Sequence, residues 1–311
     1  MRMTEAEWRD LVICLLCLAV AACFPWMVGA YWLSIGVSIA MFTVLSTSWA
    51  IFSGPTHFIS LATAAFFGVG AYVVGIGIDY LPYYVLLPIA AVLGGLLAFL
   101  VGLATLRLSG VYFVIFTLGL AEFLRQMITW VQNISGTKGM YVLTSITEEH
   151  IYWQLLALAA GVWFSGWMIG RMRLGFALRI IGDDETVAKH VGINTSRAKV
   201  LLFMLPGSVA ALAGAIIAPR YVYIEPSIAF TPMLSFQVVI MALLGGTGRL
   251  WGPLVGVIPF TLLWEVISIS APNQTTLLLG VSFLVIVYFL PKGFVGLVAS
   301  IKRHSSIRGA Q

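Results

Sequence analysis

The chain has 311 residues, of which 60% are apolar and only 9% are charged, with a formal net charge of +5. Soluble domains carry about 25% charged residues, so this composition excludes a cytosolic enzyme, a nucleic-acid-binding protein and a disordered chain. The chain is therefore predicted to be an all-α polytopic membrane protein that lies in a lipid membrane.

Ten apolar stretches come close to the length of about 20 residues that a helix needs to cross a bilayer. The third stretch opens with polar and small residues, which favours a re-entrant start, and the eighth is shorter than the rest. About ten transmembrane helices are therefore expected. In chain order they are Leu11–Val28, Tyr31–Ile51, Thr56–Ile78, Tyr83–Thr105, Gly110–Val131, Ile151–Gly170, Lys199–Ala218, Pro232–Leu244, Pro253–Ile269 and Thr275–Leu290.

The basic residues favour one orientation of these spans, because Lys and Arg concentrate on the cytoplasmic side of membrane proteins. Ten spans place the N- and C-termini on one side. With both termini cytoplasmic, 14 basic residues lie inside, two (Lys138 and Arg220) lie outside, and Arg125 lies within a span. The expected organisation is a cytoplasmic N-terminus over 1–10, a membrane domain over 11–298 and a cytoplasmic tail over 299–311.

Small residues recur every four positions in two places. Such spacing lets helix backbones approach each other closely in lipid, so both sets are predicted to be helix-packing positions. The two sets are Gly94, Ala98 and Gly102, and Gly248, Gly252 and Gly256.

Glu122 and Arg125 are three residues apart on the fifth span, and Gln126 is four residues after Glu122. Ionisable residues within spans are costly and often functional. The cluster fits either a structural ion pair that neutralises itself or a polar part of a substrate route. In the second case it would suit an ion-coupled secondary transporter or channel.

The longest inner loop, residues 171–198, predicts a short helix across the cytoplasmic face. Asp183 or Asp184 can cap its N-terminus, where a carboxylate also suits the helix dipole. Gly192 stands where a left-handed residue ends a helix. Three polar residues can cap the span that follows, namely Asn194, Thr195 and Ser196.

Val187 and Val191 are four residues apart and would share one side of this short helix. Two interpretations remain. The segment is either an ordered surface loop whose charges are solvated, or a docking helix that transmits force from a cytoplasmic partner.

Residues 245–253 are too rich in Gly and Pro for a continuous helix. They predict a turn on the cytoplasmic face, shaped by Gly246, Gly248 and Gly252, with Arg249 holding the inner side. The turn is either a structural corner or a contact with a cytoplasmic partner.

Several motifs together carry a family resemblance. They are Phe66–Tyr72, Gly110–Phe113, Gly175–Arg179, Asp183–Glu185, Gly192–Asn194, Leu244–Pro253 and Pro291–Gly293. In combination they resemble the ABC importer permeases of branched-chain amino acids of the LivM type, over roughly residues 31–298.

The resemblance implies a transport subunit rather than an enzyme, in a bacterial-type cytoplasmic (inner) membrane. Its implied partners are a homologous second permease, two cytoplasmic ATPase subunits that bind ATP-Mg, and an extracytoplasmic substrate-binding protein. No cofactor is expected on this chain. It lacks a Gly-x-x-x-x-Gly-Lys-Ser/Thr phosphate loop, so it should not bind ATP through that motif. Residues 171–198 would be the coupling loop on the ATPases, with Gly175, Arg179, Asp183, Asp184, Glu185 and Gly192 as its coupling residues.

The implied cargo is a branched-chain or other hydrophobic amino acid. The third span departs from the family pattern Gly-x-x-Gly-Gln-x-Ser-Leu-Gly-His, since His57, Phe58, Ala62 and Thr63 replace a Gly, the Gln, another Gly and the His. Urea, amides or aromatic compounds therefore remain alternative cargoes. No catalytic or metal-binding residues are predicted, and the candidate pathway residues are His57, Ser60, Thr63, Thr117, Glu122, Gln126 and Gln237.

Overall fold

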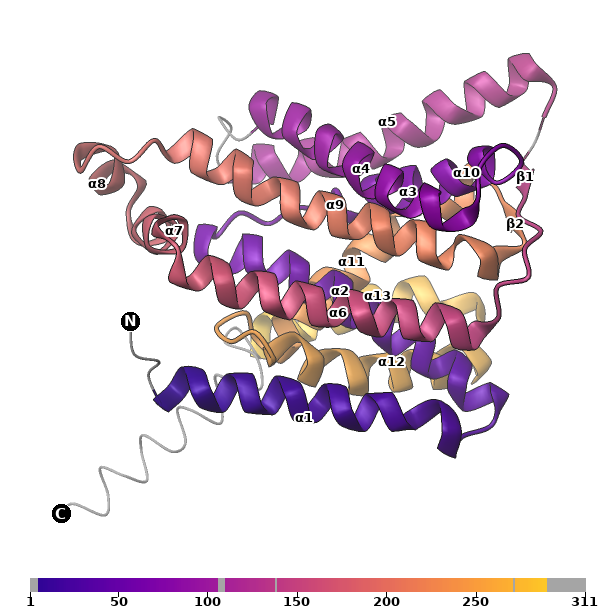
Figure 1. Ribbon diagram of the computed structural model, residues 1–311. Coiled ribbons are helices and arrows are strands. Elements are labelled where there is room, and N and C mark those ends of the chain that lie inside the picture. Colours follow the sequence, from indigo (N-terminus) through magenta and orange to yellow (C-terminus); the bar gives the residue numbers. More distant parts are fainter. Residues whose placement is uncertain (1–4, 106–109, 138, 271, 290–311) are drawn as a thin grey trace.

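The computed structural model describes residues 5–105, 110–137, 139–270 and 272–289. Its long helices run roughly side by side between two ends of a bundle (Figure 1). Residues 1–4 of the expected N-terminus, the end of the tenth span at Leu290 and the expected tail over 299–311 lie outside the described residues.

The described helices follow most of the predicted spans. Seven segments among the described residues are long and apolar enough to cross a membrane, with α10 and α11 counted as one. The longer helices are α1 (Glu5–Met27), α2 (Ala30–Thr56), α4 (Tyr83–Thr105), α5 (Val111–Ser135), α6 (Glu148–Arg171), α9 (Thr195–Tyr221) and α12 (Gly252–Ser270). The shorter ones are α3 (Thr63–Gly77), α7 (Arg173–Asp183), α8 (Glu185–His190), α10 (Pro226–Ala229), α11 (Pro232–Gly245), η1 (Pro272–Gln274) and α13 (Thr275–Phe289).

Two short strands mark one end of the bundle, and α7 and α8 mark the other (Figure 1). β1 (Met140–Tyr141) pairs antiparallel with β2 (Tyr223–Ile224), so that Met140 faces Ile224. This pair ties the segment before α6 to the segment after α9.

α2 is the central helix, and it is buried along most of its length. Val37, Val44, Leu45 and Phe52 are fully buried, and α2 contacts α6, α9, α11 and α12. The outer helices instead expose large apolar side chains, which a lipid membrane can cover. Examples on α4 and α5 are Leu93, Leu96, Leu100, Phe123, Met127 and Trp130.

Glycines bring α9 close to α3 and α4. A Cβ at Gly94 on α4 would overlap the Ala211 methyl group, and one at Gly70 on α3 would overlap the Ala211 carbonyl. Ala98 likewise meets Gly207. These contacts confirm Gly94 and Ala98 as packing positions.

The second small-residue set is confirmed only in part. A Cβ at Gly256 would overlap the Met241 carbonyl, and one at Gly252 the Gly246 carbonyl, so α12 lies directly against α11. Gly248 is exposed and has no atom of another segment near its Cβ position. Within the chain Gly248 packs against no other helix, because it lies in the turn before α12 begins, and packing of this set across a dimer stays a prediction.

The third predicted span was wrong in its first third. α3 begins at Thr63 rather than Thr56, and residues 57–62 are not helical. His57 adopts a left-handed conformation with φ of 57°, which ends α2 while its N–H donates to the Ser53 carbonyl. The break lies at the polar and small residues that favour a re-entrant start in the sequence.

The loop over 171–198 holds more helix than the sequence predicted. α7 occupies Arg173–Asp183, directly before the expected short helix. α8, over Glu185–His190, is the expected short helix, and its six residues make about 1.7 turns of 3.6 residues each.

Candidate functional site

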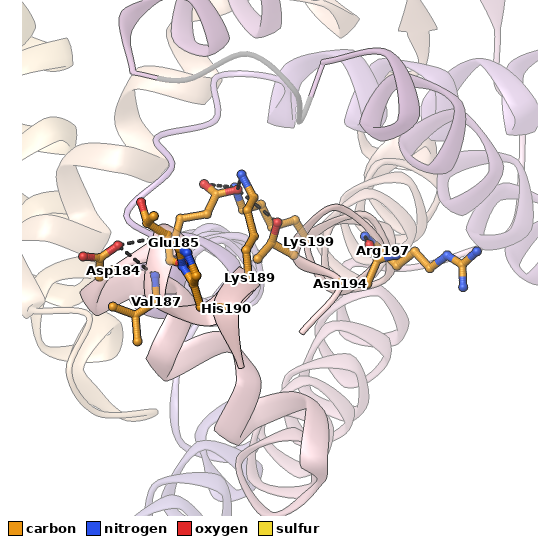
Figure 2. Close-up of polar contacts among 10 residues, drawn as sticks. Asp184, Glu185, Val187, Lys189, His190, Asn194, Arg197 and Lys199 are labelled. Carbon is orange, nitrogen blue, oxygen red and sulfur yellow. Dashed lines mark hydrogen bonds and ion pairs between the residues drawn. The ribbon is translucent and has the colours of Figure 1, made fainter. Parts of the chain in front are cut away.

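α8 is fixed at both ends by its own sequence. The Asp184 carboxylate accepts hydrogen bonds from the backbone N–H groups of Thr186 and Val187, at 2.7 and 3.2 Å (Figure 2). These backbone hydrogen bonds lower the pKa of the Asp184 carboxyl below its ordinary value. Gly192, with φ of 85°, turns the chain away after the helix. Asp184 is thus the cap, which decides between the two acids that the sequence offered.

One side of α8 is apolar and accessible. Val187 and Val191 are 51% and 68% exposed, while Ala188 between them packs into the core. α8 itself lies at the extreme end of the bundle (Figure 1). The helix therefore presents two valines outward at this end of the bundle.

A buried lysine joins α8 to α9. Lys199 is 1% exposed, and its Nζ donates to Glu185 Oε2 at 2.7 Å (Figure 2). Thr195 Oγ1 donates to Glu185 Oε1 at 3.0 Å, and Lys189 lies 3.3 Å from the same oxygen. Asn194 caps α9 by accepting from the N–H of Arg197 at 3.0 Å.

Two opposing effects act on the pKa of the Glu185 carboxyl. Partial burial, the largest single cause, raises its pKa, but the hydrogen bond and charge of Lys199 and the hydrogen bonds from Thr195 and Lys189 together lower it. The net pKa lies below the ordinary value, so the carboxylate is ionised at neutral pH.

Lys199 also reaches toward the break between α2 and α3. Its Nζ lies 4.3 Å from the ring centre of Phe58, which is a cation–π geometry. Phe58 in turn packs against Phe113 of α5, with ring centres 5.3 Å apart. A continuous set of contacts therefore runs from α8 through Glu185 and Lys199 to residues 57–62.

Residues 58–61 lie between the hydrogen-bond ladders of α2 and α3, and side chains of other helices supply several of their backbone partners. Thr117 Oγ1 accepts from the N–H of Leu61 at 3.0 Å, and Ser235 Oγ donates to the Leu61 carbonyl at 2.8 Å. Trp49 Nε1 donates to the Ser60 carbonyl at 2.8 Å. Irregular backbone at membrane depth persists where protein covers it in this way.

The structure brings only some of the predicted pathway residues together. Ser60 and Thr117 meet at the irregular segment, and Thr63 is buried where α3 starts. Gln237 is buried on α11, two residues after Ser235. Sequence reasoning missed Ser235 and Trp49, because nothing local in the sequence shows that they face this segment.

Glu122 and Gln126 lie on a different face of α5 from Thr117. Five residues of helix rotate a side chain by roughly 140°, which turns Glu122 away from the irregular segment. Arg125 Nε donates to Glu122 Oε2 at 2.8 Å, and Gln126 Nε2 donates to Oε1 at 2.9 Å. Both Arg125 and Glu122 are partly exposed. The Glu122 carboxylate is thus ion-paired and hydrogen-bonded within its own helix.

A cavity of about 900 Å³ brings a third group of predicted residues together. It opens among α1, α2, α6, α7 and the turn that follows α11. His57, Gly175, Arg179, Gly248 and Arg249 all line it. Gly246, with φ of 99°, ends α11 at this turn. Gly175 and Arg179 of the predicted coupling loop are therefore neighbours of the predicted turn residues in space.

The described residues hold no group of three or more His, Cys, Asp or Glu side chains that could bind a metal ion.

Comparison with known proteins places these features in a family. The profile of the branched-chain amino acid transport system permease component matches residues 31–290. The chain is 25% identical over 91% of its length to the high-affinity branched-chain amino acid transport system permease protein LivM of Escherichia coli, and spans 74% of that protein.

Shorter similarities involve two further permeases. The permease protein LivH of Salmonella typhimurium is 30% identical over 40% of this chain and 39% of its own length. The autoinducer 2 import system permease protein LsrC of Klebsiella pneumoniae is 26% identical over 49% of this chain and 45% of its own length. No solved structure matches the chain.

Proposed function

The chain belongs to the family of branched-chain amino acid transport system permease components, and from this premise we propose that it is the permease subunit of a binding-protein-dependent ABC importer. It is a multi-pass membrane protein of helical architecture. In the proposed importer it crosses a bacterial-type inner membrane ten times, with both termini in the cytoplasm.

The observation that carries the proposal is the construction of α8. A helix that receives force from a partner needs a rigid attachment and an accessible contact side. The Asp184 cap and the Glu185–Lys199 ion pair supply the attachment. Val187 and Val191 supply the contact side. We assign α8, with α7 behind it, as the element on which two cytoplasmic ATPase subunits dock.

The ATPase subunits bind ATP-Mg and hydrolyse it, so this chain performs no catalysis. Their movement is transmitted through Lys199 and Phe58 to residues 57–62 and opens or closes the route there. A homologous permease forms the other half of the channel. An extracytoplasmic binding protein docks at the end that carries β1 and β2 (Figure 1).

The proposed cargo is a branched-chain or other hydrophobic amino acid, which follows the name of the LivM relative. The LsrC relative is named for autoinducer 2 import, so the family carries more than one kind of cargo. Urea, amides and aromatic compounds are the alternatives, because His57 and Phe58 depart from the usual family pattern. A thermal-shift ligand screen on the cognate binding protein distinguishes these cargoes.

The docking role is tested by adding a charge to α8. In Val187→Asp, an ionised side chain must enter the proposed apolar contact. We expect co-purification of the ATPases and ATP-driven uptake to fall at least tenfold. Leu143→Asp is the matched control for ATPase co-purification alone, because Leu143 is 78% exposed and follows β1 at the opposite end, where the binding protein is proposed to dock. Normal co-purification and uptake with Val187→Asp would refute the docking role.

A self-sufficient secondary transporter or channel is the competing class. Its best candidate site is Glu122 with Arg125 and Gln126. There the Glu122 carboxylate already accepts hydrogen bonds from the other two side chains on α5. Reconstitution of this chain alone into liposomes decides the matter. Gradient-driven flux without ATPase subunits would overturn the importer proposal.

A further inference from the structure

The cavity of about 900 Å³ has a polarity that changes along the bundle. Arg171 at the end of α6, Arg179 on α7 and Arg249 in the turn after α11 line it at the end where α7 and α8 lie (Figure 1). Further along the bundle its walls are apolar and aromatic, including Ala160 and Trp163. The cavity thus has basic side chains at the end of the bundle and apolar ones toward its middle.

The depth of the cavity matches one leaflet of a bilayer. Its lining residues on α6 extend from Ala160 to Arg171. Eleven helical residues at 1.5 Å each span about 16 Å. The hydrocarbon core of a bilayer is about 30 Å thick, so one leaflet contributes about 15 Å. The cavity as a whole, with its basic end included, is therefore about as deep as the tail region of one leaflet.

The charges on the cavity wall have one sign. Among the described lining residues there are three arginines and neither Asp nor Glu. One of them, Arg171, lies over the Trp167 ring with its guanidinium carbon 4.2 Å from the ring centre. Arginine is suited to phosphate, because its planar fork of N–H donors matches the phosphate oxygens. Basic pockets between membrane helices bind anionic head groups.

We infer that this cavity binds an anionic phospholipid, with its phosphate at Arg179, Arg171 and Arg249 and an acyl chain between α1, α2 and α6. α1 lies at the edge of the bundle and forms one wall through Cys14 and Leu18 (Figure 1). A lipid can therefore enter beside α1 from the surrounding leaflet. Such binding requires only that the chain lies in a membrane, and it does not depend on the proposed transport function.

The test uses phosphatidylglycerol with brominated acyl chains, which quench nearby tryptophans. The full chain is titrated in detergent micelles, and saturable quenching reports occupation of the cavity. Trp163→Phe with Trp167→Phe should remove the saturable component, because these two indoles line the cavity. Trp153→Phe is the matched control, since Trp153 packs against Trp26 outside the cavity.

Head-group recognition is tested separately. Arg179→Gln should weaken phosphatidylglycerol binding about fivefold, the loss expected for one basic residue near an anionic membrane surface. Arg197→Gln should leave binding unchanged, since Arg197 is exposed at the start of α9 and does not line the cavity. Brominated phosphatidylcholine should quench without saturating. Equal binding of the two lipids, or an unchanged affinity in Arg179→Gln, would overturn the inference.

Two further measurements keep the test decisive if the double tryptophan variant does not fold. Ala160→Phe places a ring in the apolar part and should abolish saturable binding while all three arginines remain. Free glycerol phosphate separates a lipid site from a simple phosphate site. If it competes as well as the lipid, or if Ala160→Phe folds and binds normally, no acyl chain occupies the cavity.

Discussion

Loss of the Glu185 charge should destabilise the protein more than loss of the Lys199 charge. In Glu185→Gln the ammonium of Lys199, which is 1% exposed, loses its ionised partner at 2.7 Å. Breaking a buried pair costs about 3–5 kcal/mol, but Glu185 is 35% exposed, so we discount this for screening to about 2–3 kcal/mol. In Lys199→Met the remaining carboxylate keeps Thr195, Lys189 and some water, so about 1 kcal/mol is expected.

A double-mutant cycle measures this difference. The free energy of unfolding is obtained by denaturant titration in mixed micelles for both single variants and for the double variant. The double variant should be more stable than Glu185→Gln alone, because it no longer buries an unpaired ammonium. If the two single effects are equal and additive, the buried-pair reasoning is wrong.

The same pair predicts a dependence of stability on pH. Its folded-state pKa is depressed, so the Glu185 carboxylate stabilises the fold fully above the ordinary Glu pKa of about 4.3. This contribution is lost as the pH falls through the lower folded-state pKa. The free energy of unfolding of the wild type should therefore fall more steeply below about pH 4 than that of Glu185→Gln. Parallel curves would contradict the assignment.

Three further predictions concern backbone and packing. Gly192→Ala should cost about 1–2 kcal/mol of unfolding free energy because φ is 85° there, whereas Gly161→Ala on α6, which has open space at its Cβ position, should be neutral or stabilising in the same titration. Thr117→Val should cost about 1–3 kcal/mol and reduce uptake, because it leaves the buried N–H of Leu61 unpaired, while Thr117→Ser should retain both; equal loss in the two variants would contradict this. Gly94→Leu should prevent accumulation of folded protein, since it forces α4 away from α9; wild-type amounts on size-exclusion chromatography would refute the close contact.

The sequence predicted correctly those helices and caps that depend only on residues close together in the chain. The Asp184 cap, the Gly192 turn and the Asn194 cap each depend on residues within three positions of each other. α4 occupies Tyr83–Thr105, as the hydropathy predicted. These features could be read from the sequence because neighbouring residues determine them.

The misplaced elements depend on distant residues. The break over 57–62 is stable because side chains from α2, α5 and α11 satisfy its backbone, and no local pattern reveals that arrangement. α7 escaped prediction because its 11 residues are flanked by charges and lie between two expected elements. The positions of the predicted pathway residues also depend on distant contacts. The structure places them in three separate regions, which are the irregular segment, the cavity and the outer side of α5.

The irregular segment also has a consequence for biogenesis. The N–H of Ala64 bonds to Ser235 Oγ, which lies 171 residues later in the chain. At about 5–20 residues per second, a ribosome needs roughly 10–30 seconds to make that interval. During this time α2 and α3 have left the ribosome, but the partner of Ala64 does not yet exist. Until then the Ala64 N–H must bond to water, the insertion machinery or a chaperone. The segment between α2 and α3 therefore reaches its final hydrogen bonding only after α11 enters the membrane.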